Sequence, residues 1–342
     1  MPIACVTPAA GNMSHYKKLT CRDRPQSLKV RALLGRCVDC SKCAAPAVTL
    51  VRYSGQHLCR AHFLEFVERR VRQELRRQSD FHGGETVVVG LSGGKDSSVA
   101  TLLLKEVLGD RRDFHLVAVT VDEGIAEYRP GGIEAARTLC ASLGVEHRVV
   151  SYQGRYGVEM DAVVRRDPEA IPCGYCGVFR RGSLNAAARD LGADYLVTGL
   201  NLDDTAQAVL MNLCRGDVEK MARLGPHEIV QPGLVPRLQP LRLIPEKEVY
   251  LYAMLRGIAF HDATCPHANR AQRQRFREVI AQLEGASPGT RHAIVAAHEE
   301  LRPLLAQKYP PREAPRCERC GEPTANRLCR ACALTAGLAR MA

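Results

Sequence analysis

Through the centre of the chain, short apolar runs alternate with amphipathic stretches. The apolar runs predict strands at residues 86–91, 116–121, 146–152 and 195–198. The stretches between and after them predict helices at 97–108, 132–143, 182–191 and 203–214. This alternation indicates βαβ units, so we expect an α/β fold with a doubly wound parallel sheet that is buried on both faces. Ligands of such sheets bind beyond the carboxyl ends of the strands, near the switch in strand order.

The two ends of the chain do not follow this pattern. Residues 1–36 lack hydrophobic periodicity and predict a flexible basic extension, and residues 37–66 predict a small metal-binding finger. The main domain is expected at 67–308, with helices near 247–257, 270–283 and 289–305, and a second metal-binding module at 309–342. A further helix is expected at 63–78. With no apolar run of roughly 20 residues and no apolar leader, we expect a cytoplasmic protein.

Charge suggests a partner. The 342 residues carry a net charge of +11, and the basic residues concentrate at 17–36 and 312–340. A basic excess of this size suits a polyanion such as nucleic acid, because neutralising phosphates releases counterions. Solubility alone would also account for the charge.

Fifteen cysteines are the chain's most unusual compositional feature. In a reducing compartment they are metal ligands or catalytic thiols more often than disulfides. Two terminal groups have complete four-ligand spacing, so we expect two closed, structural zinc sites. Their ligands are Cys40, Cys43, Cys59 and His62 in the first, and Cys317, Cys320, Cys329 and Cys332 in the second. Cys37 could replace Cys40, at the cost of the CxxC spacing.

The most specific motif is SGGKDS, residues 92–97, between a predicted strand and a predicted helix. Its glycines allow a tight turn that brings backbone N–H groups close to an anion, and the helix N-terminus favours negative charge. Serine hydroxyls and a lysine add hydrogen bonds and positive charge. The motif lacks Walker A spacing but predicts a phosphate-binding loop formed by Ser92, Gly93, Gly94, Lys95, Asp96 and Ser97.

A second motif, PCGYCG, places Cys173 and Cys176 on what we expect to be the connection before a helix. A CxxC pair is typical of half a zinc site, a redox dithiol or cluster ligands. Cys265 supplies a third cysteine far along the chain. Three thiolates can hold a cubane cluster by three irons and leave the fourth iron open, whereas three unrelated buried cysteines are the structural alternative.

Carboxylates follow two of the predicted strands. Asp203 and Asp204 come at a strand end and helix start, and Asp122 and Glu123 end another strand. Carboxylates there can hold Mg²⁺ or orient a proton transfer, and Asp203 or Asp204 could equally be a helix N-cap. We expect one of that pair to cap the helix and the other to face the site, with Asp122 and Glu123 as similar candidates near an adenosine.

SGGKDS resembles the signature of the PP-loop ATP pyrophosphatases. The whole order of motifs, from Cys40 to Cys332, resembles the tRNA 2-thiouridine synthetases, which include a thermophile T-loop enzyme and wobble-uridine enzymes of archaea and eukaryotes. The resemblance implies that residues 92–97 bind ATP, that Asp204 is catalytic, and that Cys173, Cys176 and Cys265 ligate a 4Fe–4S cluster. Two departures stand out. The family's usual histidine is Leu200 here, which receives no role, and Arg180 stands where some relatives have lysine, so we assign it an electrostatic role.

The resemblance also implies a mechanism and partners. ATP, with Mg²⁺, adenylylates the uridine C2 oxygen and releases pyrophosphate, and sulfide on the open iron then attacks C2 and expels AMP. Expected partners are tRNA, a ubiquitin-like sulfur carrier, and a second copy of the chain or a partner subunit. The alternatives are a 2-thiocytidine synthetase, a cluster-free enzyme that uses a persulfide on Cys173 or Cys176, and a non-catalytic tRNA-binding subunit.

Overall fold

In the computed structural model the described residues are 38–109, 113–169, 171–226, 232–268, 273–310 and 314–340. They fall into two compact units, Met1–Phe66 and Val67–Ala342. The predicted basic extension at 1–36 and the alternative ligand Cys37 lie outside the described residues.

The first unit contains a short antiparallel hairpin. Strands β1 (Thr49–Val51) and β2 (Gln56–Leu58) pair so that Thr49 lies opposite Leu58. Helix α2 (Arg60–Gln78) begins directly after Cys59, slightly before its predicted start at residue 63, and extends into the second unit. Cys40 and Cys43 precede the hairpin, and Cys59 and His62 follow it at the start of α2. All four predicted ligands of the first metal site therefore belong to one short segment of the chain.

The second unit is built on a parallel sheet of five strands in the order β5-β4-β3-β6-β7. These are β3 (Thr86–Gly90), β4 (His115–Asp122), β5 (Glu146–Ser151), β6 (Tyr195–Thr198) and β7 (Arg237–Leu238). The first four were predicted; β7 lies in a Pro-rich connection whose composition gave no strand signal. Strand order reverses between β3 and β6, so a crevice is expected beyond their carboxyl ends.

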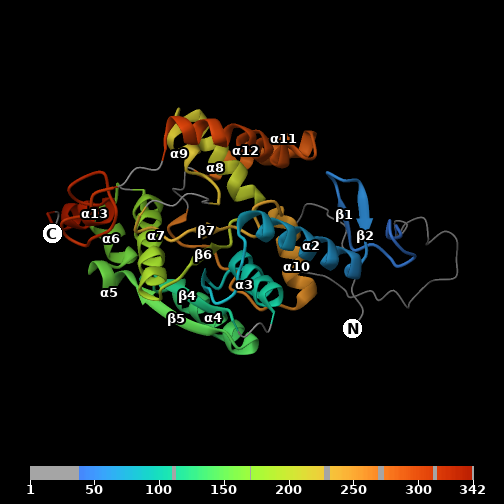
Figure 1. The fold of residues 1–342 in the computed structure, drawn as a ribbon, viewed down its shortest axis with the longest axis horizontal. Coiled ribbons are helices and arrows are strands. Elements are labelled where there is room, and N and C mark those ends of the chain that lie inside the picture. The colour runs from blue at the N-terminus through green and yellow to red at the C-terminus, as the bar shows by residue number, and fades with distance from the viewer. Residues whose placement is uncertain are drawn as a thin grey trace. The chain divides into compact units, whose positions relative to one another are not determined.

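Helices flank this sheet, as predicted for a doubly wound fold (Figure 1). Helix α3 (Lys95–Leu108) contacts β3, α4 (Arg129–Leu143) contacts β4 and β5, and α7 (Pro172–Asp190) contacts β4, β5 and β6. Val88, Val117 and Leu196 pack with the small residues Ala187 and Ala188 of α7 in one buried cluster. Small side chains let the helix approach the sheet closely, and the predicted fold class is confirmed.

Most of the remaining helices come after strand β6 in the chain and pack against one another. Helices α8, α9, α11 and α12 contact one another, and α10 packs against α3 (Figure 1). Their bounds are α8 (Leu202–Cys214), α9 (Val218–Ala222), α10 (Glu246–Arg256), α11 (Arg273–Ala286) and α12 (Thr290–Lys308). Three further helices complete the described elements: α5 (Tyr152–Tyr156), α6 (Met160–Arg166) and α13 (Arg330–Ala339). None of the helices in the described residues is both long enough and apolar enough to cross a membrane.

One sequence prediction is wrong about α7. The PCGYCG motif was expected on a connection before a helix at 182–191, but α7 already begins at Pro172. Proline is well suited to the first helical position, where its missing N–H has no intrahelical partner and its φ is already helical. Cys173 and Cys176 therefore lie in the opening turns of a long, rigid helix.

The C-terminal cysteine module packs within the second unit. Helix α13 contacts α5 and α7. Cys317, Cys329 and Cys332 belong to the same buried cluster as Tyr152 and Phe179, which line the inner side of α5 and α7. The module therefore shares its hydrophobic core with the helix that carries Cys173 and Cys176.

Candidate nucleotide and metal sites

The phosphate loop follows β3 and leads into α3. The Ser97 hydroxyl donates to the carbonyl of Gly94 (3.0 Å) and accepts from the N–H of Ser92 (3.1 Å), closing the loop on itself. Gly94 is the N-cap of α3 and provides no side-chain acceptor. The first N–H groups of α3 thus meet no capping side chain, which suits an incoming anion.

Glycines make this loop geometrically possible. Gly93 has φ +81°, and a Cβ there would lie 2.0 Å from the carbonyl oxygen of Gly132 at the start of α4. A Cβ on Gly199, at the end of β6, would lie 2.8 Å from the backbone nitrogen of Ser97. Neighbouring backbone segments therefore touch the loop from two sides.

A buried ion pair lies behind the loop. Arg129 donates to the carbonyl of Ser92 (2.9 Å) and to the carboxylate of Glu123 (3.0 Å), and both side chains are almost fully buried. Burial raises the pKa of Glu123, opposed by the charges of Arg129 and Arg180. Glu123, a predicted candidate near the adenosine, is thus engaged with Arg129, a residue that no sequence motif indicated. Asp122, the other candidate of that strand end, accepts from the N–H of Gly124 (2.9 Å).

The lysine of the phosphate loop lies between two carboxylates. Lys95 Nζ lies 3.1 Å from Asp96 and 2.9 Å from Glu246, and the Asn201 amide donates to Asp96 (3.0 Å). Burial opposes the charge of Lys95, but Glu246 and Asp96 raise its pKa on balance. Glu246 is the first residue of α10, a position where an acidic residue ordinarily only complements the helix dipole, so no sequence signal singled it out.

Neither Asp203 nor Asp204 is the N-cap of the helix, as had been predicted for one of them. Asn201 is the N-cap of α8, and Asp204 completes a capping box with it while also facing Arg273 (3.3 Å). Asp203 accepts from the backbone N–H of Glu246 (2.8 Å) and pairs with Arg291 (2.7 Å), so its carboxylate connects the start of α8 to α10 and α12.

Asn201 is therefore the N-cap, and the Asp204 carboxylate closes the capping box and pairs with Arg273. Burial raises its pKa, as does the charge of Asp96, while Arg273 lowers it. A buried carboxyl group between charges of both signs is a candidate for proton transfer.

The three cysteines predicted as cluster ligands lie on two segments: Cys173 and Cys176 are in the first turns of α7, and Cys265 is on the loop before α11. Cys176 and Cys265 pack against the same buried cluster. Burial raises the pKa of both thiols, and negative charge at Cys173 raises it further in each. Three soft thiolates are the donor set that iron–sulfur clusters use. The residues present therefore fit such a cluster.

Two histidines fix the loop that carries Cys265. The backbone N–H of His261 donates to the carbonyl of Gly93 (2.8 Å), so this loop touches the phosphate loop. His267 Nε2 lies 2.7 Å from Asp161 Oδ1 on α6, and the other oxygen of Asp161 accepts from the N–H of Ala126 (2.9 Å). The cysteine loop is tied at both ends, which the sequence did not indicate because the partners are far apart along the chain.

Arg180 lies one turn after Cys176 on α7. Its guanidinium is 4.0 Å from Glu123, and its positive charge lowers the pKa of the Cys176 thiol against the effect of burial. The electrostatic role expected for Arg180 remains a prediction.

Both terminal cysteine groups fit a tetrahedral ion. In each, the four ligand atoms all lie within 4.8 Å of one another. Cys43 and Cys59 sulfurs are 3.8 Å apart, and Cys320 and Cys329 sulfurs 3.5 Å. Zinc with bonds of about 2.3 Å to sulfur separates two sulfurs by about 3.8 Å, so both groups suit a closed zinc site.

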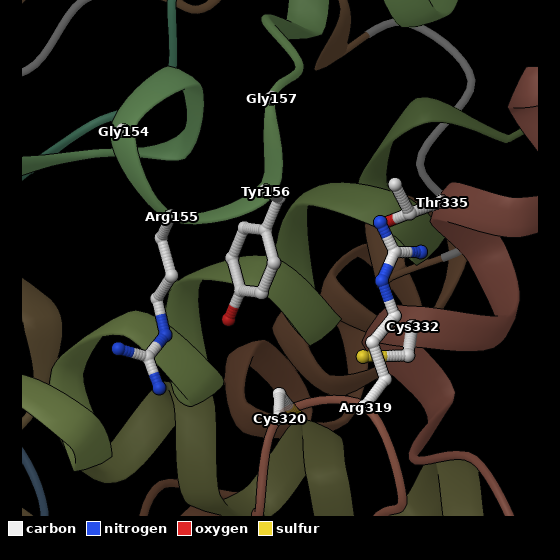
Figure 2. A pocket seen from close by; sticks show the side chains of 8 residues that line it. All are labelled: Gly154, Arg155, Tyr156, Gly157, Arg319, Cys320, Cys332 and Thr335. Carbon is white, nitrogen blue, oxygen red and sulfur yellow. The ribbon is translucent and has the colours of Figure 1, made fainter.

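A cavity of about 570 Å³ lies beside the C-terminal module (Figure 2). Its walls are the α5 segment 154–157 and, across from the Tyr156 ring, residues of the module. The module contributes Arg319, Cys320, Cys332 and Thr335. No residue of the phosphate loop lines it, so this cavity is separate from the nucleotide site.

Comparison with known proteins agrees with this geometry. The PP-loop domain family matches residues 64–284, and the family described as 2-thiouridine synthetase TtuA, N-terminal LIM domain, matches residues 39–64. The tRNA 2-thiolation protein NcsA of Haloferax volcanii is 43% identical over 314 residues, covering 87% of this chain and 98% of that protein. This chain belongs to the tRNA 2-thiouridine synthetase family of PP-loop enzymes.

Two other members extend the comparison. Cytoplasmic tRNA 2-thiolation protein 1 of Arabidopsis thaliana is 35% identical, over 83% of this chain and 80% of that protein. A solved structure described as U34-tRNA thiolase NcsA from Methanococcus maripaludis with its [4Fe-4S] cluster has a TM-score of 0.77 and 34% identity, covering 88% of this chain and 96% of that one. The fold of that solved structure therefore extends over 88% of this PP-loop enzyme.

Proposed function

We propose that this PP-loop enzyme converts a tRNA uridine to 2-thiouridine with ATP, by adenylylating the C2 oxygen and then replacing it with sulfur. The observation that carries the proposal is the meeting of two sites: the loop with Cys265 is hydrogen-bonded, through His261, to the phosphate loop at Gly93. Thiolation needs two activations, of the oxygen as a leaving group and of sulfur as a nucleophile. Adjacent nucleotide and thiolate sites support a function in which both occur on one substrate.

The nucleotide half of the reaction falls to the phosphate loop. Ser92, Gly93, Gly94 and Ser97 would present hydroxyl and N–H donors to the phosphates, and Lys95 would add charge. Asp96 and Asp204, with Asp122 nearer the nucleoside, are the carboxylates proposed to hold Mg²⁺ or to move a proton. This half activates the C2 oxygen, because AMP is a far better leaving group than oxide.

The sulfur half falls to the three cysteines. Cys173, Cys176 and Cys265 would hold a 4Fe–4S cluster, which would supply positioned sulfide at an iron that no protein ligand occupies. Arg180 would stabilise negative charge beside Cys176. The alternative at this site is a cluster-free enzyme that carries a persulfide on Cys173 or Cys176, with Cys265 as the resolving thiol.

Partners and location follow from the same function. A tRNA would bind basic residues around the terminal modules, whose zinc ions would hold the folds together; those of the C-terminal module are Arg316, Arg319, Arg327 and Arg330. We further propose a cytoplasmic location, a ubiquitin-like protein as sulfur carrier, and a homodimer or partner subunit.

A single anaerobic reaction tests the proposal. Full-length protein with reconstituted iron and zinc is incubated with ATP, Mg²⁺, sulfide and unmodified tRNA, and the nucleosides are analysed by mass spectrometry. We expect 2-thiouridine, and its position in the tRNA identifies the target. Thiolated cytidine, or activity that survives Lys95→Ala and Asp96→Ala, would contradict the proposal.

Cysteine variants test the sulfur site in the same assay. Cys173→Ala, Cys176→Ala and Cys265→Ala should each lose bound iron and thiolation. Cys214→Ala is the matched control, because Cys214 is exposed at the end of α8, apart from the proposed ligands. Full activity in preparations that contain no iron would exclude the cluster and favour the persulfide alternative.

A further inference from the structure

Two arginines of α11 reach the nucleotide site. Arg273 lies 3.3 Å from Asp204, and Arg277 lies 2.7 Å from Glu246. Residues four apart share one face of a helix, so both guanidinium groups leave α11 in the same direction. The proposed mechanism gives neither arginine a role.

The carboxylates that hold these arginines also touch the phosphate loop. Glu246 holds Lys95 with one oxygen (2.9 Å) and Arg277 with the other. Asp204 accepts from the backbone N–H of Asn201, and the side-chain amide of Asn201 donates to Asp96. Cations and carboxylates therefore alternate across the front of the loop, and the two arginines form the outer edge of that network.

Helix α11 is anchored while its arginines stay accessible. Ile280 is buried in a cluster with Leu202 and Ala206 of α8, the helix that starts beside the phosphate loop. The side chains of Arg273 and Arg277 remain 45% and 54% exposed. A fixed backbone with exposed guanidinium groups is preorganised for a ligand that arrives from solvent.

We infer that Arg273 and Arg277 bind the phosphates of ATP that leave as pyrophosphate. A triphosphate on residues 92–97 would compete with Asp204 and Glu246 for the two guanidinium groups, which bind phosphate oxygens through paired N–H donors. Stabilising charge on the leaving pyrophosphate lowers the barrier to adenylylation. The inference rests on the proposed function and adds two residues to its nucleotide site.

The test measures ligand binding without turnover. Calorimetry on the anaerobic holoenzyme, without tRNA, compares Mg-ATP, pyrophosphate and AMP. Arg273→Ala and Arg277→Ala should each weaken Mg-ATP and pyrophosphate about ten-fold or more and leave AMP affinity within about two-fold, because AMP lacks the leaving phosphates. Arg275→Ala is the matched control: Arg275 is an exposed cation of α11, and a residue two positions from both Arg273 and Arg277 lies on a different face of the helix.

Two outcomes would overturn the inference. Unchanged ATP and pyrophosphate affinity with weaker tRNA binding would assign the arginines to RNA phosphates, and unchanged affinity for all ligands would leave them as structural ion pairs. If an alanine variant loses its fold or metals, Arg277→Lys keeps the charge and removes the paired donors, so it should still weaken pyrophosphate. Thiolation by the unmodified protein is scored separately, so the proposed function can hold while this inference fails.

Discussion

At the scale of single residues, the phosphate loop depends on a contact that only glycine allows. Gly93 adopts φ +81°, a conformation that costs other residues about 1–2 kcal/mol. A Cβ at Gly93 would also lie 2.0 Å from the carbonyl oxygen of Gly132, which is backbone and cannot rotate away. Any side chain there must displace the loop or the start of α4.

Gly93→Ala should therefore lower ATP affinity at least ten-fold. Gly94→Ala provides the contrast, because a Cβ there meets only the Ser92 hydroxyl at 3.4 Å and its φ of −81° is open to all residues. Calorimetric titration with Mg-ATP, alongside thermal unfolding, measures both effects. Equal losses in the two variants would contradict this account of the loop.

His292, on α12, makes the stability of the fold sensitive to acid. Burial, and after it the charge of Arg70, whose guanidinium lies 3.2 Å from His292 Nε2, lower the pKa of His292 to about 4. The unfolded chain has an ordinary histidine pKa of about 6.5 and so takes up a proton first as pH falls. The stabilising contribution is thus complete above pH 6.5 and is lost as pH falls toward 4.

Between pH 7.5 and 5.5, the free energy of unfolding should fall by about 1 kcal/mol more in the unmodified protein than in His292→Gln, allowing for the partial exposure of the ring. Glutamine can still accept from Arg70 but does not titrate. Urea denaturation at both pH values measures the difference. Parallel pH dependence in the two proteins would exclude His292 as the cause.

At the scale of an element, the loop before α11 links two sites. His261 is hydrogen-bonded to the phosphate loop at Gly93, and His267 is bonded to Asp161 on α6. Cys265 lies between these two attachments. A loop held at both ends loses little entropy when its cysteine binds a metal, because the geometry is already fixed.

Removing one attachment should loosen the cysteine without removing it. His267→Ala should lose reconstituted iron several times faster than the unmodified protein during anaerobic gel filtration, while zinc content and unfolding temperature change little. His115→Ala is the control, since His115 forms a comparable pair with Glu146 (3.2 Å) at an exposed strand start. Equal iron retention in all three proteins would show that this histidine does not position Cys265.

The elements themselves were mostly predictable. Periodicity located β3, β4 and β6 and most longer helices because those segments are buried on faces that repeat at regular intervals. The start of α7 was missed because PCGYCG carries two glycines, which usually mark loops, while the packing of this helix against the sheet overrides that local preference.

The parts of the candidate site that could be predicted are those whose functional residues are close together in the sequence. SGGKDS and the cysteine spacings point to the phosphate loop and the metal groups. Arg129, Glu246 and His267 gave no such signal, because each acts through a partner distant in sequence: Ser92, Lys95 and Asp161. Only the fold brings those pairs together.

At the scale of the molecule, the second unit joins a structural metal module to the proposed sulfur site. Glu322 of the module accepts from Arg155 (3.0 Å) and Arg189 (2.8 Å), on α5 and α7. Cys332 and Leu338 are buried in the same cluster as Phe179 of α7. The opening turns of α7 carry Cys173 and Cys176, so the packing that supports those cysteines includes the module.

Loss of zinc from the C-terminal module should therefore weaken the binding of iron by the cysteines of α7. Cys332→Ser breaks the C-terminal four-thiolate group, and we expect it to lose one zinc per chain and also to retain less than half of the reconstituted iron, with faster proteolysis near α13. Arg327→Ala is the matched control, because Arg327 pairs with Glu318 on the exposed side of the same module and should keep both metals. Metal analysis of the purified proteins decides the matter. If Cys332→Ser loses zinc and keeps all its iron, the shared core contributes nothing to the sulfur site and the module serves another purpose, such as RNA binding.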